Sequence, residues 1–185
     1  MYLIVGLGNP EEEYGRTRHN MGFDVINKLS ENLNIKVNKN KFNSLYGTGT
    51  INGEKIILIK PQTYMNLSGE AVRDFKNFYK VNPENIIIIY DDLDIEPGMM
   101  KIRKKGGPGT HNGMKSVVHE LQTEDFPRIR IGIGNPEYKN DLLNYILTKI
   151  PEEDYKVLEN SIKNAANAIE EIIKNSIDSA MNRFN

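Results

Sequence analysis

Two of the three histidines lie in polar loops, where an imidazole could take a proton from water or from a substrate. His19 stands in the segment TRHNMGF, and His111 stands in the glycine-rich segment GGPGTHNG. An imidazole with its ordinary pKa of about 6.5 is a natural proton acceptor at neutral pH. His119 falls inside a predicted helix, where we expect it to have a structural role.

Three acidic side chains, Asp91, Asp92 and Asp94, follow a run of four consecutive isoleucines. Carboxylates at the end of a strand can hold Mg²⁺ against phosphates. They can also orient an imidazole by accepting a hydrogen bond from its second nitrogen. A turn or a helix cap is the structural alternative, because Asp favours both. The sequence leaves these three interpretations open.

Amide side chains stand beside the same segments, at Asn9, Asn66 and Asn112. An amide both donates and accepts hydrogen bonds, so these residues suit a peptide backbone and a carbonyl oxygen. The glycine-rich segment could offer backbone N–H groups to a phosphate, although a flexible turn explains it equally well.

Several familiar catalytic patterns are missing from the chain. There is no cysteine, no G-x-S-x-G elbow, no phosphate loop and no H-E-x-x-H motif. The segment GLGNPE carries Pro10 and Glu11 where a dinucleotide fingerprint has its third glycine. The three histidines could in principle form a zinc site, but no two have the spacing of ligands on one helix. We therefore expect neither a metal nor a cofactor, and a histidine that activates water against a labile bond such as an ester.

The elements that must position these side chains follow from apolar periodicity. The alternation of strands and helices predicts an α/β protein, a single-domain α/β/α sandwich around a mixed, largely parallel twisted sheet, over residues 1–185. Ligands of such sheets bind beyond the carboxyl ends of the strands, where one edge could gather all the polar segments. The predicted strands are 2–7, 45–51, 54–60, 85–92, 99–104 and 128–134, and the predicted helices are 22–33, 68–80, 113–121, 140–148 and 151–176.

Charge is distributed unevenly along a chain whose formal net charge is −1. Residues 101–130 hold seven basic and three acidic side chains, which indicates either a polyanionic partner or a solvated face. No apolar run approaches the roughly 18 residues of a membrane helix. We expect a cytoplasmic monomer with no signal peptide and no membrane partner.

Six motifs, in this order, resemble those of the bacterial peptidyl-tRNA hydrolases. They are VGLGNPEEEYGRTRHNMGF, YMNLSGEAV, YDDLDIEPG, GTHNGMKS, RIRIGIGNP and AMNRFN, and the match runs from residue 2 to 185. Each motif alone is unspecific, but all six in sequence are highly specific. The resemblance implies a water, deprotonated by a histidine, that cleaves the ester between a peptide and the 3′ end of tRNA without a metal.

The resemblance also implies roles for individual residues. His19 would be the general base, Asp91 would support its protonated form, and Asn9 would contact the peptide and help to discriminate N-blocked from free aminoacyl-tRNA. Asn112 would bind near the scissile ester with His111 beside it. The remaining implied residues line the substrate site or contact tRNA phosphates: Tyr14, Tyr64, Met65 and Asn66 in the first group, Arg103 and Arg130 in the second.

The chain departs from the family pattern at Glu11 and Thr110, where glycine is usual, and at Tyr64, where phenylalanine is commoner. Thr110 does not readily adopt a positive φ, so the placement of His111 and Asn112 depends on how the loop is built. Two rival functions are a Mg²⁺-dependent phosphotransferase or phosphatase using Asp91, Asp92 and Asp94, and a non-catalytic RNA-binding module.

Overall fold

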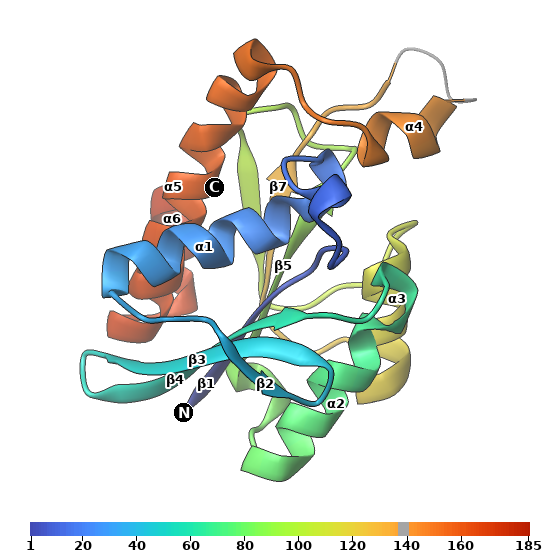
Figure 1. Cartoon of the computed structure of the whole chain (residues 1–185). Coiled ribbons are helices and arrows are strands. Elements are labelled where there is room, and N and C mark those ends of the chain that lie inside the picture. Colours follow the sequence, from blue (N-terminus) through green and yellow to red (C-terminus); the bar gives the residue numbers. More distant parts are fainter. Residues whose placement is uncertain (137–140) are drawn as a thin grey trace.

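The computed structural model describes residues 1–136 and 141–185. Within these residues the chain forms one seven-stranded sheet in the order β2-β3-β4-β1-β5-β7-β6 (Figure 1). The four central strands are parallel, and both edges are antiparallel, so the predicted mixed sheet is confirmed with its parallel part at the centre. The strands are β1 Tyr2–Gly6, β2 Lys39–Lys41, β3 Ser44–Ile51, β4 Glu54–Pro61, β5 Ile86–Asp92, β6 Met100–Arg103 and β7 Arg128–Gly132.

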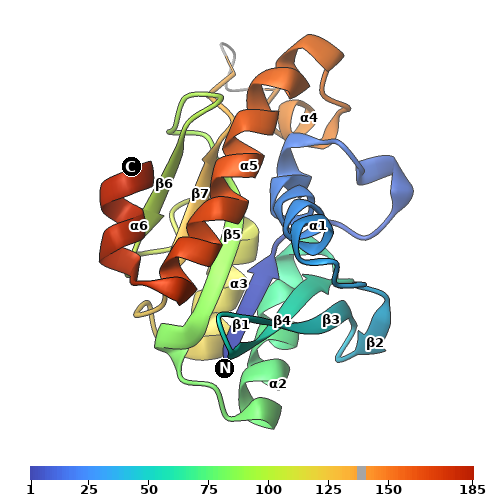
Figure 2. The same ribbon diagram turned by 90° about the vertical axis from the view of Figure 1, so that its left-hand side faces the viewer.

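Helices cover both faces of the sheet and complete the predicted three-layer sandwich (Figure 2). On one face lie α1 (Met21–Leu33), α5 (Glu152–Lys174) and α6 (Ile177–Phe184), and on the other lie α2 (Ser68–Tyr79) and α3 (Asn112–Leu121). The short helix α4 (Leu142–Leu147) lies near the carboxyl ends of the central strands (Figure 1). No helix in the described residues is long and apolar enough to span a membrane.

The isoleucine strand β5 is buried on both faces, as its composition predicts. Successive side chains of a strand point to opposite faces. Ile87 and Ile89 therefore pack in the core beneath α1 and α5, while Ile86 and Ile88 pack in the core beneath α2 and α3. The β3–β4 hairpin turns at Asn52 and Gly53, which both have positive φ as an Asn-Gly turn requires.

Some details differ from the sequence prediction. The last predicted helix, 151–176, ends at Lys174, and α6 follows as a separate helix whose cap is the Ser176 hydroxyl, which accepts the Ser179 N–H at 3.1 Å. Strand β2 is not predicted by the sequence, because three polar residues carry no periodicity. The predicted helix 140–148 is shorter than expected, and its first residue lies outside the described part of the chain. His119 lies within α3, as predicted, on its surface beside Glu120.

Candidate active site

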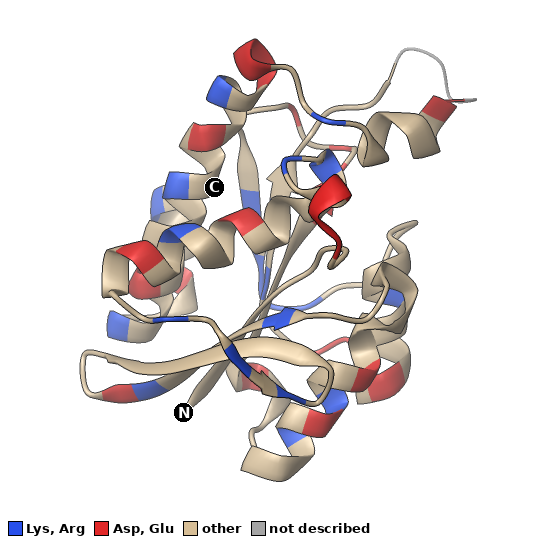
Figure 3. Ribbon diagram, in the orientation of Figure 1, with Lys and Arg blue, Asp and Glu red and all other residues tan. Residues whose placement is uncertain are grey.

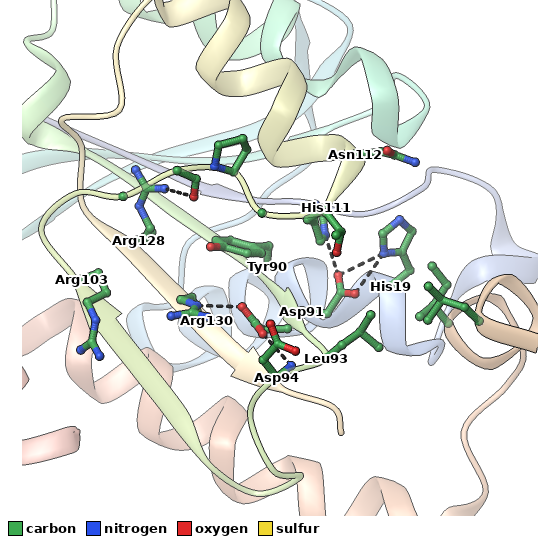
Figure 4. A pocket seen from close by; sticks show the side chains of 18 of the residues that line it. His19, Tyr90, Asp91, Leu93, Asp94, Arg103, His111, Asn112, Arg128 and Arg130 are labelled. Atoms are coloured by element: carbon green, nitrogen blue, oxygen red, sulfur yellow. Dashed lines mark hydrogen bonds and ion pairs between the residues drawn. The ribbon is translucent and has the colours of Figure 1, made fainter. Parts of the chain in front are cut away.

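Asp91, at the end of β5, joins the two loop histidines into one hydrogen-bonded group (Figure 4). His19 Nδ1 lies 3.1 Å from both carboxylate oxygens of Asp91, and His111 Nε2 lies 2.9 Å from Oδ1. The two imidazole rings are 4.9 Å apart between centroids. Each of the three side chains is less than a tenth exposed, so little water competes for these bonds.

The hydrogen bonds fix which ring nitrogen carries the proton on each histidine. The backbone N–H of Met114 donates to His111 Nδ1 at 3.2 Å, so a neutral His111 has its proton on Nε2 and donates it to Asp91. An ionised carboxylate only accepts, so His19 must donate from Nδ1. Its Nε2 then keeps a lone pair, as a base requires.

The same three side chains could bring a metal ion three ligand atoms, which lie within 4.8 Å of one another. A metal would need the lone pair of His111 Nε2, the nitrogen that holds the proton. Moving that proton to Nδ1 would set it against the N–H of Met114. The hydrogen-bond pattern therefore favours a proton-handling group over a metal site.

The pKa values of Asp91 and His19 are shifted in opposite directions. Burial acts to raise the pKa of the Asp91 carboxyl, but the two imidazoles outweigh it and hold that pKa well below its ordinary value. Burial acts to lower the pKa of His19, while the charge and hydrogen bond of Asp91 raise it, and the net shift is upward from 6.5. Asp91 thus stays a carboxylate, and it favours the protonated form of His19.

Local structure explains how His19 reaches Asp91. Alternation along β5 places Asp91 on the face of Ile87 and Ile89, which is the face that α1 covers. His19 lies in the short 3₁₀ helix η2 (Arg18–Asn20) that leads into α1. A Cβ on Gly22 would come within 2.5 Å of the Ile89 carbonyl oxygen, so only glycine lets α1 begin this close to the sheet.

Asn9 is the centre of a second polar group beside His19. Its Oδ1 accepts the Met65 N–H at 3.0 Å. The amide Nδ2 of Asn9 therefore remains as the donor that a ligand could use. The buried amide of Asn20 holds the Asn9 backbone through two hydrogen bonds of 2.9 Å. Met65 begins the 3₁₀ helix η3 (Met65–Leu67), so the loops after β1 and β4 are fixed to each other.

A cavity of about 530 Å³ opens from Asp91 and the two histidines along the face of β5 and β7. The glycine loop 106–110 and apolar residues of α4 form other parts of its wall. Among the residues that line it are the four basic side chains Arg103, Lys105, Arg128 and Arg130.

Basic residues occur along both β6 and β7 (Figure 3). Three of them, Arg103, Arg128 and Arg130, line the cavity. Ile102, Ile129 and Ile131 point to the opposite core, so Arg103, Arg128 and Arg130 share the other face. Across the ladder Lys101 pairs with Arg130, and Arg103 pairs with Arg128. Like charges opposite each other destabilise a sheet, and here Arg130 is compensated by Asp92 and Arg128 by backbone carbonyls. The wall of the cavity is basic, which suits an anionic ligand.

The structure divides the site residues expected from the sequence into two groups. His19, Asp91, Arg103, His111, Asn112 and Arg130 all line the cavity. The other five, Asn9, Tyr14, Tyr64, Met65 and Asn66, lie outside that lining, on or next to η1 (Glu12–Tyr14) and η3. Tyr64 is 54% exposed and donates its hydroxyl proton to Glu11, and Asn66 is also exposed.

The departures at residues 11 and 110 do not disturb the site. Glu11 has a φ of −71°, which any residue adopts. In the glycine loop Gly109 takes the positive φ of 60°, and Thr110 does not have a positive φ. The loop therefore delivers His111 to Asp91 without strain at Thr110.

The three acids of residues 91–94 do not converge on one point. Asp91 accepts from both histidines, whereas Asp92 Oδ2 accepts from Arg130 Nε at 2.7 Å and Asp92 Oδ1 accepts the Asp94 N–H at 2.8 Å. Asp92 thus forms an Asx turn and an ion pair, and this geometry does not suit a shared Mg²⁺.

Sequence reasoning misses two residues that shape the site. The sequence marks Asn20 only as a neighbour of His19, and Arg128 only as one of the basic residues of 101–130. Alternation in RIRIG could have placed Arg128 beside Arg130, but nothing in the sequence reports its burial.

The fold and the site define a class: an α/β protein in which a carboxylate at a strand end orients a histidine next to a basic cavity. Comparison with known proteins then specifies the class further. A family model described as peptidyl-tRNA hydrolase matches residues 3–185, and the chain belongs to this family.

The relatives support the assignment over the full length. The chain is 54% identical to a peptidyl-tRNA hydrolase of Alkaliphilus metalliredigens, with both chains fully covered, and 53% identical to one of Clostridium botulinum, of which 96% is covered. The crystal structure of peptidyl-tRNA hydrolase from Acinetobacter baumannii matches with a TM-score of 0.95 at 38% identity, covering all of this chain and 94% of that one.

Proposed function

We propose that this protein hydrolyses the ester bond between a peptide, or an N-blocked amino acid, and the 3′ end of tRNA. The observation that carries the proposal is the hydrogen bond from His19 to Asp91, which leaves the lone pair of His19 Nε2 available in the wall of a basic cavity. Membership of the peptidyl-tRNA hydrolase family supplies the substrate class.

In the proposed reaction, His19 Nε2 takes a proton from a water whose oxygen attacks the ester carbonyl carbon. The imidazolium that forms donates from Nδ1 to Asp91, whose negative charge stabilises it. When the tetrahedral intermediate collapses, the bond to the ribose 3′ oxygen breaks, and His19 returns the proton to that oxygen. His111 holds Asp91 Oδ1 from the other side and keeps the carboxylate oriented.

Substrate recognition is divided between the two groups of residues. Asn9, Tyr14, Tyr64, Met65 and Asn66 would receive the peptide and the tRNA end, and Asn112 would bind near the scissile ester. Arg103 and Arg130 would contact tRNA phosphates, which agrees with the like-charge pairs across β6 and β7. The protein would act as a monomer in the cytoplasm.

The test is hydrolysis of N-acetylaminoacyl-tRNA compared with free aminoacyl-tRNA, after treatment with a chelator. We expect release of the blocked amino acid, little release of the free one, and no effect of the chelator. The His19→Ala variant should lose about 10²–10⁴ in kcat. Near-normal turnover by this variant would refute the base assignment, and loss of activity on chelation would favour the Mg²⁺-dependent alternative. Tight tRNA binding without any hydrolysis would indicate an RNA-binding module.

A further inference from the structure

Arg128, the first residue of β7, is charged and yet only 1% exposed, which is unusual for an arginine. No ion pair with a carboxylate involves it among the described residues, in contrast to Arg130, which pairs with Asp92 at 2.7 Å. Withdrawing an unpaired guanidinium from water is unfavourable, and burial lowers the pKa of Arg128. An apolar side chain could be buried here at a lower cost in free energy. The hydrogen bonds of the guanidinium must therefore explain why an arginine stands at this position.

The guanidinium of Arg128 ties two loops together through backbone carbonyls. Its Nη1 donates to the Gly107 carbonyl at 3.3 Å (Figure 4). Its Nη2 donates to the Glu124 and Phe126 carbonyls at 2.8 and 3.4 Å. The ring of Phe126 lies 4.3 Å from the guanidinium carbon. The buried Nε has no hydrogen-bond partner among the described residues, so the carbonyl contacts set the orientation of the side chain.

The loop that Arg128 holds is the glycine loop that ends at His111. The Gly106 N–H donates to the Glu124 carbonyl at 3.3 Å, the same oxygen that Arg128 Nη2 binds. Gly106 and Gly109 both have positive φ, so the loop has little conformational preference of its own. Its far end is fixed by His111 on Asp91, and its near end is fixed by Arg128.

We propose that Arg128 is a positioning residue for the proposed ester hydrolysis: its forked hydrogen bonds seat the glycine loop over the cavity and thereby place His111 and Asn112. The inference rests on the proposed function for its kinetic consequences, but the seating of the loop can be measured without any substrate. A planar fork can bond carbonyls of two loops at once, whereas an ammonium group cannot span them with the same geometry.

The experiment compares Arg128→Lys, which keeps the charge, with Arg128→Met, which keeps much of the volume. Hydrogen exchange of the Gly106 amide reports directly on the seating of the loop. We expect both variants to exchange this amide at least about tenfold faster, while amides of α5 are unchanged. The control Lys163→Met, on the exposed surface of α5, removes the same charge and should leave Gly106 protected.

Kinetics on N-acetylaminoacyl-tRNA provide the second measurement. Both Arg128 variants should raise KM by about tenfold or more and lower kcat less, since a misplaced loop weakens substrate positioning. The salt dependence of binding should stay that of the parent protein. If Arg128→Lys behaves as the parent while Arg128→Met loses about one unit of salt slope, Arg128 contacts a phosphate directly and the inference is wrong. Unchanged exchange in both variants also overturns it.

A second variant covers the case in which both Arg128 substitutions prevent folding. Gly106 has a φ of 154°, which L side chains rarely adopt, and a Cβ there would face Arg128 Nη1 at 3.9 Å. Gly106→Ala should therefore release the loop while β7 stays intact, and reproduce the fast exchange and the raised KM. If Gly106→Ala retains the parent KM despite fast exchange in residues 104–110, the seating of the loop does not matter for substrate binding. Failure of the parent protein to hydrolyse the ester would instead refute the proposed function.

Discussion

Asp91 and Asp24 are carboxylates in sheltered surroundings, and their environments drive their pKa values in opposite directions. Asp91 accepts from two imidazoles, and its pKa is held well below the ordinary value despite its burial. Asp24, on α1, accepts from the Tyr155 hydroxyl at 3.1 Å, and burial raises its pKa to about 6. The comparison teaches that two imidazole partners outweigh burial at Asp91, whereas a single phenol donor does not outweigh it at Asp24.

The charges near Asp24 are engaged elsewhere. Arg16 pairs with Glu152 at 2.9 Å, and Lys60 donates to the Asn27 amide at 2.8 Å. They lower the pKa of Asp24 only from a distance, less strongly than burial raises it. Asp24 therefore fits a structural link between α1 and α5, while Asp91 fits a group that must remain an anion during a reaction.

The largest effect should come from Asp91→Asn, with Asp24→Asn as the matched control. The amide that replaces the Asp91 carboxylate would carry no negative charge to stabilise an imidazolium, so we expect a loss of about 10²–10⁴ in kcat/KM for N-acetylaminoacyl-tRNA. The pKa of His19 should also fall, which moves the acid limb of the pH profile to lower pH. Asp24→Asn should keep hydrolysis within about twofold. Equal losses in both variants would show that the two carboxylates differ less than the geometry indicates.

The Asp24→Asn substitution should have a smaller effect, and it should be a gain: the variant should be more stable than the parent protein at high pH. Asp24 ionises near its model value of 3.8 in the unfolded chain but at about 6 in the folded protein. Between these values the folded protein binds more protons, so the contribution of Asp24 to stability falls as the pH rises from about 4 to 6. The variant should gain on the order of 1 kcal/mol in the free energy of unfolding at pH 8 and nothing near pH 4.

Urea denaturation at the two pH values measures this gain. Asp91→Asn offers the contrast, because its lowered pKa means that Asp91 stabilises the fold above pH 3.8 and loses that contribution on further acidification. A destabilised Asp24→Asn variant at pH 8 would show that the Tyr155 hydrogen bond to the carboxylate outweighs the cost of burying its charge.

The fold was largely predictable because its signals are local. Four consecutive isoleucines predict the central strand β5, and Asn52-Gly53 predicts the β3–β4 hairpin. The separate helix α6 was not predictable in this way. The position of α6 depends on a contact with a residue far away in the sequence. The side-chain amide of Asn185 accepts the Ile102 N–H and donates to the Ile102 carbonyl, on β6. Such pairing is invisible in a window of sequence.

The candidate site was predictable as a set of residues but not as a geometry. Motifs identify His19 and Asp91, but the tautomer of His111 depends on the Met114 N–H, which only the start of α3 brings into place. Arg128 and Arg130 lie on the same face of β7. Arg128 is nevertheless buried against backbone carbonyls, whereas Arg130 pairs with Asp92. The difference arises from loops that pack over β7, so the strand sequence alone does not contain it.

The smallest effects concern two phenols that perform the same chemistry in different surroundings. Tyr155 donates to Asp24 in the crevice between α1 and α5, and Tyr64 donates to Glu11 on the surface. Removing the sheltered hydroxyl leaves a carboxylate with less solvation, so Tyr155→Phe should lose up to about 1 kcal/mol of the free energy of unfolding at pH 8. Near pH 4 the loss should shrink, because Asp24 is then protonated. Tyr64→Phe should leave the urea midpoint unchanged at both pH values, since water replaces the lost donor. A pH-dependent loss in Tyr64→Phe would mean that Glu11 is far less accessible to water than its exposure indicates.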